Sequence, residues 1–357
     1  NKKISKLLMI NKKKKTRTVT FFYLREEEKQ IFLNLVPELK KKKFTIKFSK
    51  KLSGKADIGF YCQTDIKKIN SNISAIFLGG MDQGRNNWPN HWKKERWDKF
   101  DLGFLPGNAW EKRWQFSSNT FQSRTKYGVF KVGWPKADHL FTNQVKKNSD
   151  IRKINILYAP SFECCDKQLD VVYASKKLGY NLIIKHWLIK KEKRYIDLWE
   201  NIKKANSYSK KIYKKIKIIN PKTNFLNLLK IANLVITDES SVAYEALLYD
   251  IPTISVKNWK IQRHKKTLAR PVKPAKITYK TTKKDLSKCI LLLLKSKKKI
   301  RNLKHEHFSY IGKSSKAIVD VLESFLLNRN YISKSRYYIK PKKKISILER
   351  TKKLINI

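Results

Sequence analysis

Short apolar segments with the pattern of strands alternate with amphipathic segments along this chain, and the alternation restricts the fold more than any other feature. The first half has strand patterns at residues 18–24, 44–49, 56–62 and 74–80 and a helical pattern at 26–42. The second half has strand patterns at 154–160, 180–187, 215–220, 233–238 and 251–256, with helical patterns between them. Strands separated by helices favour parallel pairing through right-handed crossovers. The sequence therefore predicts an α/β fold built from two Rossmann-like, doubly wound parallel sheets.

The length of 357 residues suits two such domains. We place them at 1–147 and 148–328, with the boundary inside a polar connector at 142–153, and leave a basic C-terminal tail at 329–357 that either packs back or lies disordered. Ligands of open α/β sheets bind at the carboxyl ends of the strands. The two domains are therefore expected to face each other across a cleft lined by strand-to-helix turns.

The charge of the chain is strongly positive, with 82 lysine and arginine residues against 28 acidic ones and a formal net charge of +54. Such an excess would attract nucleic acid, anionic lipid or phosphorylated ligands. The lysines are scattered through every segment, beside abundant isoleucine and asparagine, which favours a compositional origin such as AT-rich codon usage. Nucleic acid is therefore not the expected partner, whereas an anionic membrane surface stays compatible with the charge.

No apolar run reaches the roughly 18 residues that cross a bilayer, and the apolar segment near residue 1 is too short for a signal peptide. We expect a cytoplasmic protein, either free or peripheral at the inner face of the plasma membrane. The four cysteines, Cys62, Cys164, Cys165 and Cys289, lack metal-binding spacing. Reduced thiols and no structural zinc are therefore expected.

One nearly lysine-free passage, residues 231–256, reads as strand, turn, helix and second strand. Its turn places Ser240 and Ser241 at the start of the helix. Their hydroxyls and the free backbone N–H groups there could hold a phosphate, with help from the helix dipole. The same two serines could also do no more than cap the helix.

The order and spacing of Asp238, Ser240, Ser241, Glu245 and Pro252 resemble the nucleotide-binding segment of GT-B transferases. Among these, the segment specifically resembles the CDP-glycerol glycerophosphotransferase family of teichoic-acid enzymes. Three earlier segments, at 103–114, 132–141 and 156–163, are also similar to segments of that family and occur in the same order along the chain. The resemblance implies a GT-B-like fold, a nucleotide-activated donor such as CDP-glycerol or a nucleotide-sugar, and a glycan or lipid-linked acceptor.

The resemblance also implies roles on the donor side. Ser240 and Ser241 would hold the donor pyrophosphate, and Glu245 would accept hydrogen bonds from the ribose, unless it merely pairs with a lysine. Asp238 is expected to order the turn rather than touch substrate. The family's Lys-x-His-Pro segment corresponds to Lys185 and His186, which are adjacent here, so the register of this contact changes. Either His186 contacts phosphate or it is structural, with Lys185 as the point charge.

On the acceptor side, the family's His-Gly pair is replaced by Gly79 and Gly80. Glycines allow a ligand to approach the backbone closely, so this turn is expected to persist as a binding turn. The general base would then come from elsewhere. The sequence offers Asp82 and His91 for that role, although His91 could equally be a packing residue among tryptophans.

The stretch 81–100, rich in amides and tryptophans, offers Arg85 and Trp88 as acceptor-binding residues through hydrogen bonding and stacking, or as parts of an ordinary surface helix. No DxD motif stands at a strand end, so metal-independent transfer without a cofactor is expected.

The leading interpretation is a transferase that moves a glycerophosphate, or a related nucleotide-activated group, onto a cell-surface glycan precursor. The alternatives are a GT-B glycosyltransferase that uses a nucleotide-sugar, a nucleotide-sugar epimerase, and a non-catalytic basic protein that binds nucleic acid.

Overall fold

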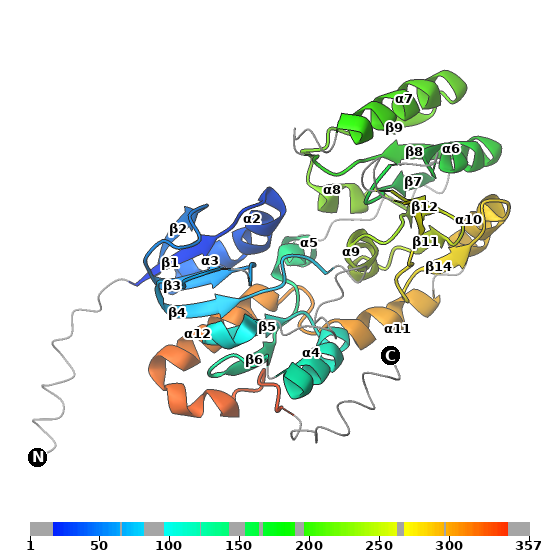
Figure 1. Ribbon diagram of the computed structural model, residues 1–357. Coiled ribbons are helices and arrows are strands. Elements are labelled where there is room, and N and C mark those ends of the chain that lie inside the picture. Colours follow the sequence, from blue (N-terminus) through cyan, green and yellow to red (C-terminus); the bar gives the residue numbers. More distant parts are fainter. Residues whose placement is uncertain are drawn as a thin grey trace, which may run out of the picture.

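A computed structural model describes residues 17–64, 66–81, 96–121, 123–142, 154–163, 167–189, 196–262, 268–295 and 298–341. Within these ranges the chain forms two six-stranded sheets, each entirely parallel, and one short antiparallel ribbon. The two sheets lie in separate halves of the molecule, with α5 (His139–Thr142) and α9 (Val242–Leu248) between them (Figure 1). The predicted α/β fold with two doubly wound parallel sheets is confirmed.

The first sheet has the strand order β2-β1-β3-β4-β5-β6. Its strands are β1 (Thr18–Phe22), β2 (Thr45–Ser49), β3 (Ala56–Tyr61), β4 (Ser71–Ile76), β5 (Leu102–Leu105) and β6 (Gly128–Lys131). The helical and 3-10 segments of this half are α2 (Glu26–Leu33), α3 (Leu35–Lys41), η1 (Arg96–Lys99), α4 (Asn108–Phe121), η2 (Pro135–Ala137) and α5.

Two predicted elements of this half differ from the structure. The single helix expected at 26–42 is broken at Asn34 into α2 and α3. Pro37 explains the break, because proline has no N–H to donate to the carbonyl of Leu33. The strand expected at 74–80 ends at Ile76, which leaves Gly79 and Gly80 in the loop that follows β4.

The second sheet has the strand order β14-β11-β10-β7-β8-β9. Its strands are β7 (Asn155–Tyr158), β8 (Asn181–Ile184), β9 (Ile216–Ile218), β10 (Leu234–Ile236), β11 (Thr253–Val256) and β14 (Tyr279–Thr281). The helices of this half are α6 (Lys167–Leu178), α7 (Ile196–Ile212), α8 (Phe225–Leu229), α9, α10 (Leu286–Lys295) and α11 (Lys298–His307). The ribbon consists of β12 (Lys260–Ile261) and β13 (Arg270–Pro271).

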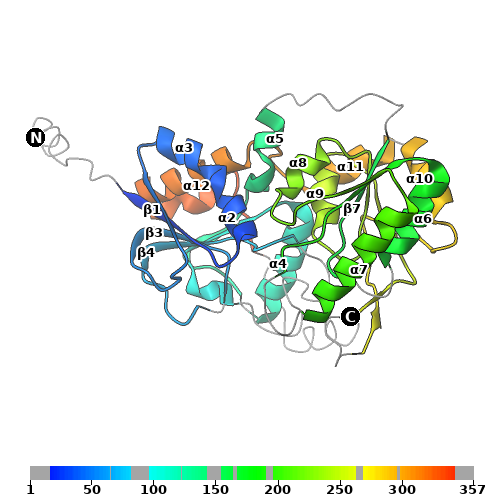
Figure 2. The ribbon, with the colours of Figure 1, turned by 90° about the horizontal axis from the view of Figure 1, so that it is seen from above.

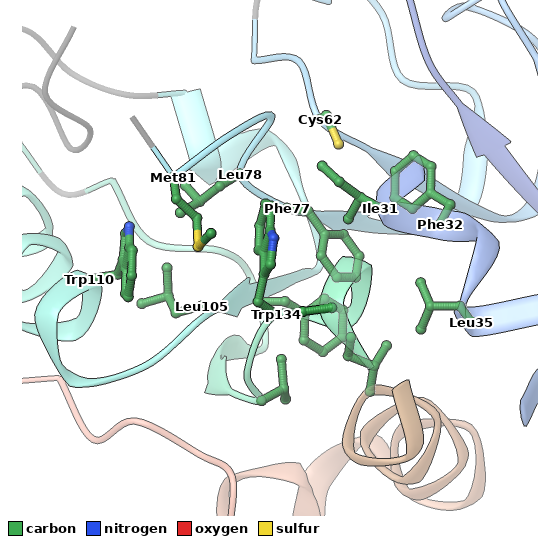
Figure 3. Close-up of a cluster of buried hydrophobic side chains, with 14 of the residues drawn as sticks. Ile31, Phe32, Leu35, Cys62, Phe77, Leu78, Met81, Leu105, Trp110 and Trp134 are labelled. Atoms are coloured by element: carbon green, nitrogen blue, oxygen red, sulfur yellow. The ribbon is translucent and has the colours of Figure 1, made fainter. Parts of the chain in front are cut away.

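An aromatic core fixes the loop after β4. Phe77, Leu78 and Met81 are all buried, and Figure 3 shows them in a cluster with Trp110 and Trp134. Gly79 and Gly80 lie between these anchors, so the packing on either side of them holds the loop in place. The apolar residues therefore position a turn that itself carries no side chain.

The chain returns to the first half after α11. Helix α12 (Ser314–Leu327) contacts α3, and Figure 2 shows it beside α3 and away from α10. The segment that follows, η4 (Arg329–Lys334) and residues 335–341, adds backbone hydrogen bonds to β6, from Lys131 N to Tyr337 O and from Ile339 N to Val129 O. The boundaries at 147 and 328 stay predictions, but α12 and this part of the predicted tail pack on the first half.

Asp138 joins the start of α12 to the first half. Its buried carboxylate accepts hydrogen bonds from the backbone N–H groups of Ser314 (3.1 Å) and Ser315 (2.5 Å). Burial raises the pKa of Asp138, and these hydrogen bonds oppose that rise. Asp138 therefore serves α12 as a cap across 176 residues of sequence.

Replacing Asp138 by alanine should lower the free energy of unfolding by about 2 kcal/mol, because two buried N–H groups lose a charged acceptor. Urea denaturation followed by circular dichroism measures the change. Glu38→Ala, which removes a carboxylate that pairs with Lys41 at the surface, is the control and should cost less than about 0.5 kcal/mol. Equal losses in the two variants would contradict the capping role.

Within the described ranges, no helix is long and apolar enough to cross a membrane.

Candidate functional site

A cleft of about 310 Å³ lies between the two halves, at the carboxyl ends of strands from both sheets. From the first half it is lined by Glu27, Ile31, Gly79, Gly80, Trp134 and Lys136. From the second half it is lined chiefly by Ser161, Lys185, Trp187, Ser240, Ser241 and Glu245. The structure thus brings the predicted turn at Gly79 and Gly80 into one cleft with the predicted turn at Ser240 and Ser241, although 160 residues separate them.

Two other hollows lie at the opposite edge of the first sheet. They share Asp57 and Asn72 and sit near the starts of β1, β3 and β4. Because ligands of open parallel sheets bind at the carboxyl ends of strands, the cleft between the halves is the candidate site.

The two serines differ in their local contacts. The backbone N–H of Val242 donates to Ser240 Oγ at 3.3 Å, a weak local turn contact. Ser241 is the N-cap residue of α9, yet its side chain makes no capping hydrogen bond. The Ser241 hydroxyl is therefore not committed to the helix, and it lines the cleft.

Asp238 lies behind the turn rather than in the cleft. It is fully buried and accepts hydrogen bonds from the backbone N–H groups of Ser161 (2.8 Å) and Glu239 (2.8 Å). The Nζ of Lys167, also fully buried, lies 2.7 Å from its Oδ2. Burial alone would raise the pKa of Asp238, but Lys167 and the donors around it outweigh that effect and lower the pKa. Asp238 thus ties the turn after β10 to the turn after β7.

Lys185 and His186 point to different places, as adjacent residues in extended chain do. Lys185 lines the cleft, and its Nζ donates to the carbonyls of His186 (3.3 Å) and Pro221 (3.2 Å). Burial lowers the pKa of Lys185, and the charges of Glu27 and Glu245 oppose that change. His186 is buried away from the cleft, with its Nε2 3.0 Å from Gln168 Oε1. The structure therefore brings Lys185, and not His186, to the predicted donor turn.

Glu245 forms an ion pair across the cleft. Lys136 Nζ lies 2.5 Å from Glu245 Oε1, and both side chains are largely buried. The backbone that carries Lys136 is held by Asn34, whose amide donates to the carbonyls of Pro135 (2.8 Å) and Lys136 (2.9 Å). Sequence reasoning missed Lys136, because nothing in its local pattern distinguishes it from the many other lysines.

The acceptor-side turn leaves space beside Gly80. Among the described residues, a Cβ at Gly80 would meet no heavy atom within 4 Å, whereas one at Gly79 would lie 3.2 Å from Arg25 Nη2. The described part of the chain therefore leaves room for a ligand in front of Gly80. The other residues expected on this side, Asp82, Arg85, Trp88 and His91, lie outside the described residues. Glu27, which the sequence did not single out, lines the cleft beside this turn.

Two buried titratable groups under the second-half turns have opposite pH dependence. Burial raises the pKa of Glu163 to about 7 from its ordinary 4.5, against the opposing charge of Lys167. The folded state then binds more protons than the unfolded state, so stability falls as the pH rises from 4.5 towards 7. Burial lowers the pKa of His186 to about 4 from 6.5. Its contribution is present above pH 6.5 and is lost as the pH falls towards 4.

The two groups change the free energy of unfolding in opposite directions between pH 4.5 and 6.5. A variant that lacks one of them should therefore show the pH dependence that the other causes. Glu163→Gln should make the free energy of unfolding rise with pH in this window, relative to wild type, by at most about 1.4 kcal/mol per pH unit. His186→Gln should make it fall. Urea denaturation at several pH values measures both slopes, and slopes that change in the same direction would refute this assignment.

In the described parts of the chain, no group of three or more histidine, cysteine, aspartate or glutamate residues could hold a metal ion.

No protein-family model and no curated protein sequence matches the chain. Solved structures do match its fold. Wall teichoic acid polymerase TagF superposes with a TM-score of 0.59 at 15% identity, over 88% of this chain and 90% of TagF. A protein described as UDP-N-acetylglucosamine 2-epimerase from Listeria monocytogenes gives 0.58 at 12% identity, over 93% and 100% of the two chains. S. aureus MnaA with UDP superposes with a TM-score of 0.55 at 12% identity, over 87% of this chain and 97% of MnaA. The chain shares the GT-B fold with these proteins.

Proposed function

We propose that this protein is a transferase that moves a glycerophosphate, or a related nucleotide-activated group, onto a cell-surface glycan precursor. The observation that supports the proposal is the shared cleft, which Ser240, Ser241 and Lys185 line together with Gly79 and Gly80. The sequence resemblance to CDP-glycerol glycerophosphotransferases supports the same function. So do the fold neighbours, since one TagF structure was soaked with CDPG and MnaA was solved with UDP.

The donor would bind on the second-half wall. Its phosphates would accept hydrogen bonds from the hydroxyls of Ser240 and Ser241. They would also form an ion pair with the ammonium of Lys185, which lines the cleft. Glu245 would accept hydrogen bonds from ribose hydroxyls, with its carboxylate oriented by Lys136. Positive groups fixed before the reaction stabilise charge that develops on the nucleotide leaving group.

The acceptor would enter from the first-half wall. Gly80 leaves that wall open, and the buried Leu78 and Met81 keep the loop in place while a ligand binds. An acceptor hydroxyl held there would face the donor across the cleft. Alignment of the two reactants in one site lowers the entropic part of the barrier.

Ligand-induced thermal stabilisation tests the proposal. CDP-glycerol, CMP, UDP and UDP-N-acetylglucosamine are compared with single- and double-stranded oligonucleotides at fixed ionic strength. The proposal expects a saturable rise in melting temperature with at least one of the nucleotides, since a ligand that binds only the folded state stabilises it. Stabilisation by oligonucleotides alone, weakening steeply with salt, would favour a nucleic-acid-binding protein.

A further inference from the structure

We propose that Glu27 is the general base that removes the proton from the acceptor hydroxyl. This inference rests on the proposed function. Glu27 would supply the base that a histidine provides in the family that the sequence resembles, because Gly79 stands at the place of that histidine here. Glu27 lies in the first turn of α2 and is exposed. It lines the cleft on the same wall as Gly79 and Gly80, facing the donor turn of the second half.

The neighbours of Glu27 in sequence are committed to other contacts. Glu28 is fully buried and accepts hydrogen bonds from the Leu24 backbone (2.8 Å) and from Arg25 Nε (2.8 Å). Glu26 lies 3.7 Å from the ammonium of Lys50. Among the described residues, Glu27 has no hydrogen-bond or ion-pair partner. Its carboxylate is the one in this acidic run that is free to accept a proton from a ligand.

The other described carboxylate in the cleft is already occupied. Glu245 is held by Lys136 at 2.5 Å, so its carboxylate already accepts a hydrogen bond from a charged donor. The described histidines, His139, His186, His305 and His307, do not line the cleft. Within the described part of the chain, Glu27 is therefore the available proton acceptor on the acceptor wall.

Charge across the cleft supports this position. Glu27 acts electrostatically on Lys185, which belongs to the other half and lies beside the donor serines. A carboxylate that lines the same cleft as the donor turn opposes the binding of an anionic donor. The presence of such a carboxylate in the donor cleft is explained if Glu27 acts in the chemical step and not in donor binding.

The acceptor oxygen forms a bond to the transferred phosphorus of the donor, and the bond from that phosphorus to the oxygen of the nucleotide phosphate breaks. The electron pair leaves with the nucleotide, and the acceptor proton passes to a carboxylate oxygen of Glu27. Water takes the proton from Glu27 once the product has left. For a nucleotide-sugar donor the same step occurs at the anomeric carbon.

The test compares Glu27→Gln with Glu26→Gln, a matched loss of one charge from the same helical turn outside the cleft. Calorimetric titration with CMP, CDP-glycerol and UDP gives affinity, and release of CMP from CDP-glycerol, with glycerol as acceptor, gives turnover. Glu27→Gln should bind the nucleotide about three- to tenfold more tightly, because a repelling charge is gone. It should release CMP at least about 100-fold more slowly, because the base is gone. Glu26→Gln should change neither value.

A merely structural role for Glu27 would move affinity and turnover in the same direction. Unchanged nucleotide affinity in Glu27→Gln would overturn the inference, because Glu27 would then not face the donor. Unchanged turnover in a variant that still binds would overturn it as well. If none of these nucleotides binds the wild-type protein, the proposed function itself fails, an outcome that the wild-type titration separates from the other two.

Discussion

Replacing Lys167 by methionine should lower the free energy of unfolding by about 3–5 kcal/mol, the largest stability effect that we expect from a single substitution. Lys167 and Asp238 are both fully inaccessible to solvent, and their charged atoms lie 2.7 Å apart. Loss of the ammonium leaves the Asp238 carboxylate buried without its counter-charge. Chemical denaturation followed by tryptophan fluorescence and circular dichroism measures the loss.

Two comparisons make this prediction specific. Lys41→Met removes a lysine from an exposed pair with Glu38 and should cost less than about 1 kcal/mol. The double variant Lys167→Met, Asp238→Leu should lose less free energy of unfolding than the two single variants lose together, because neither buried charge remains. A loss below about 1 kcal/mol in Lys167→Met would mean that the pair is hydrated in solution.

Replacing Lys185 by methionine should weaken nucleotide binding about tenfold to a hundredfold, because hydrogen bonds to a charged group contribute about 1.5–3 kcal/mol. Lys185 lines the cleft beside Ser240 and Ser241, and its ammonium is positioned by two backbone carbonyls. Calorimetric titration with CDP-glycerol or UDP measures the affinity. Thermal denaturation of the free variant checks that it remains folded.

Lys217→Met is the control for that prediction. It removes the same charge from an exposed position on β9 of the same half. With a net charge of +54, any lysine contributes weakly to attraction of an anion, and salt screens that contribution. If Lys185→Met and Lys217→Met weaken binding equally, the cleft lysine has no specific role.

The sequence predicted the fold because the central strands of each sheet are buried on both faces. Buried parallel strands appear in the sequence as short apolar runs, such as the one at 233–238. In the helices between them, apolar residues recur every three or four positions. The same pattern placed Ser240 and Ser241 at a strand-to-helix turn, and the family resemblance singled out Gly79 and Gly80 at the end of a predicted strand. Because such turns gather at the carboxyl ends of parallel strands, the structure brings all four into one cleft.

The features that the sequence did not reveal depend on long-range contacts. The pair of Lys136 and Glu245 joins residues 109 positions apart, and Asp138 caps a helix 176 positions away. No local period marks such a partner. The choice between Lys185 and His186 depended on where β8 ends, and a shift of one residue there exchanges the side chain that faces the cleft.

The central claim is that a nucleotide-activated donor binds between the two halves with its phosphates on the turn after β10. The most direct test is a crystal structure of the wild-type protein soaked with CDP-glycerol or UDP. The account predicts phosphate oxygens within hydrogen-bond distance of the Ser240 and Ser241 hydroxyls and of Lys185 Nζ, with the ribose towards Glu245. A nucleotide bound on a lysine-rich outer surface, with the cleft filled only by water, would contradict it.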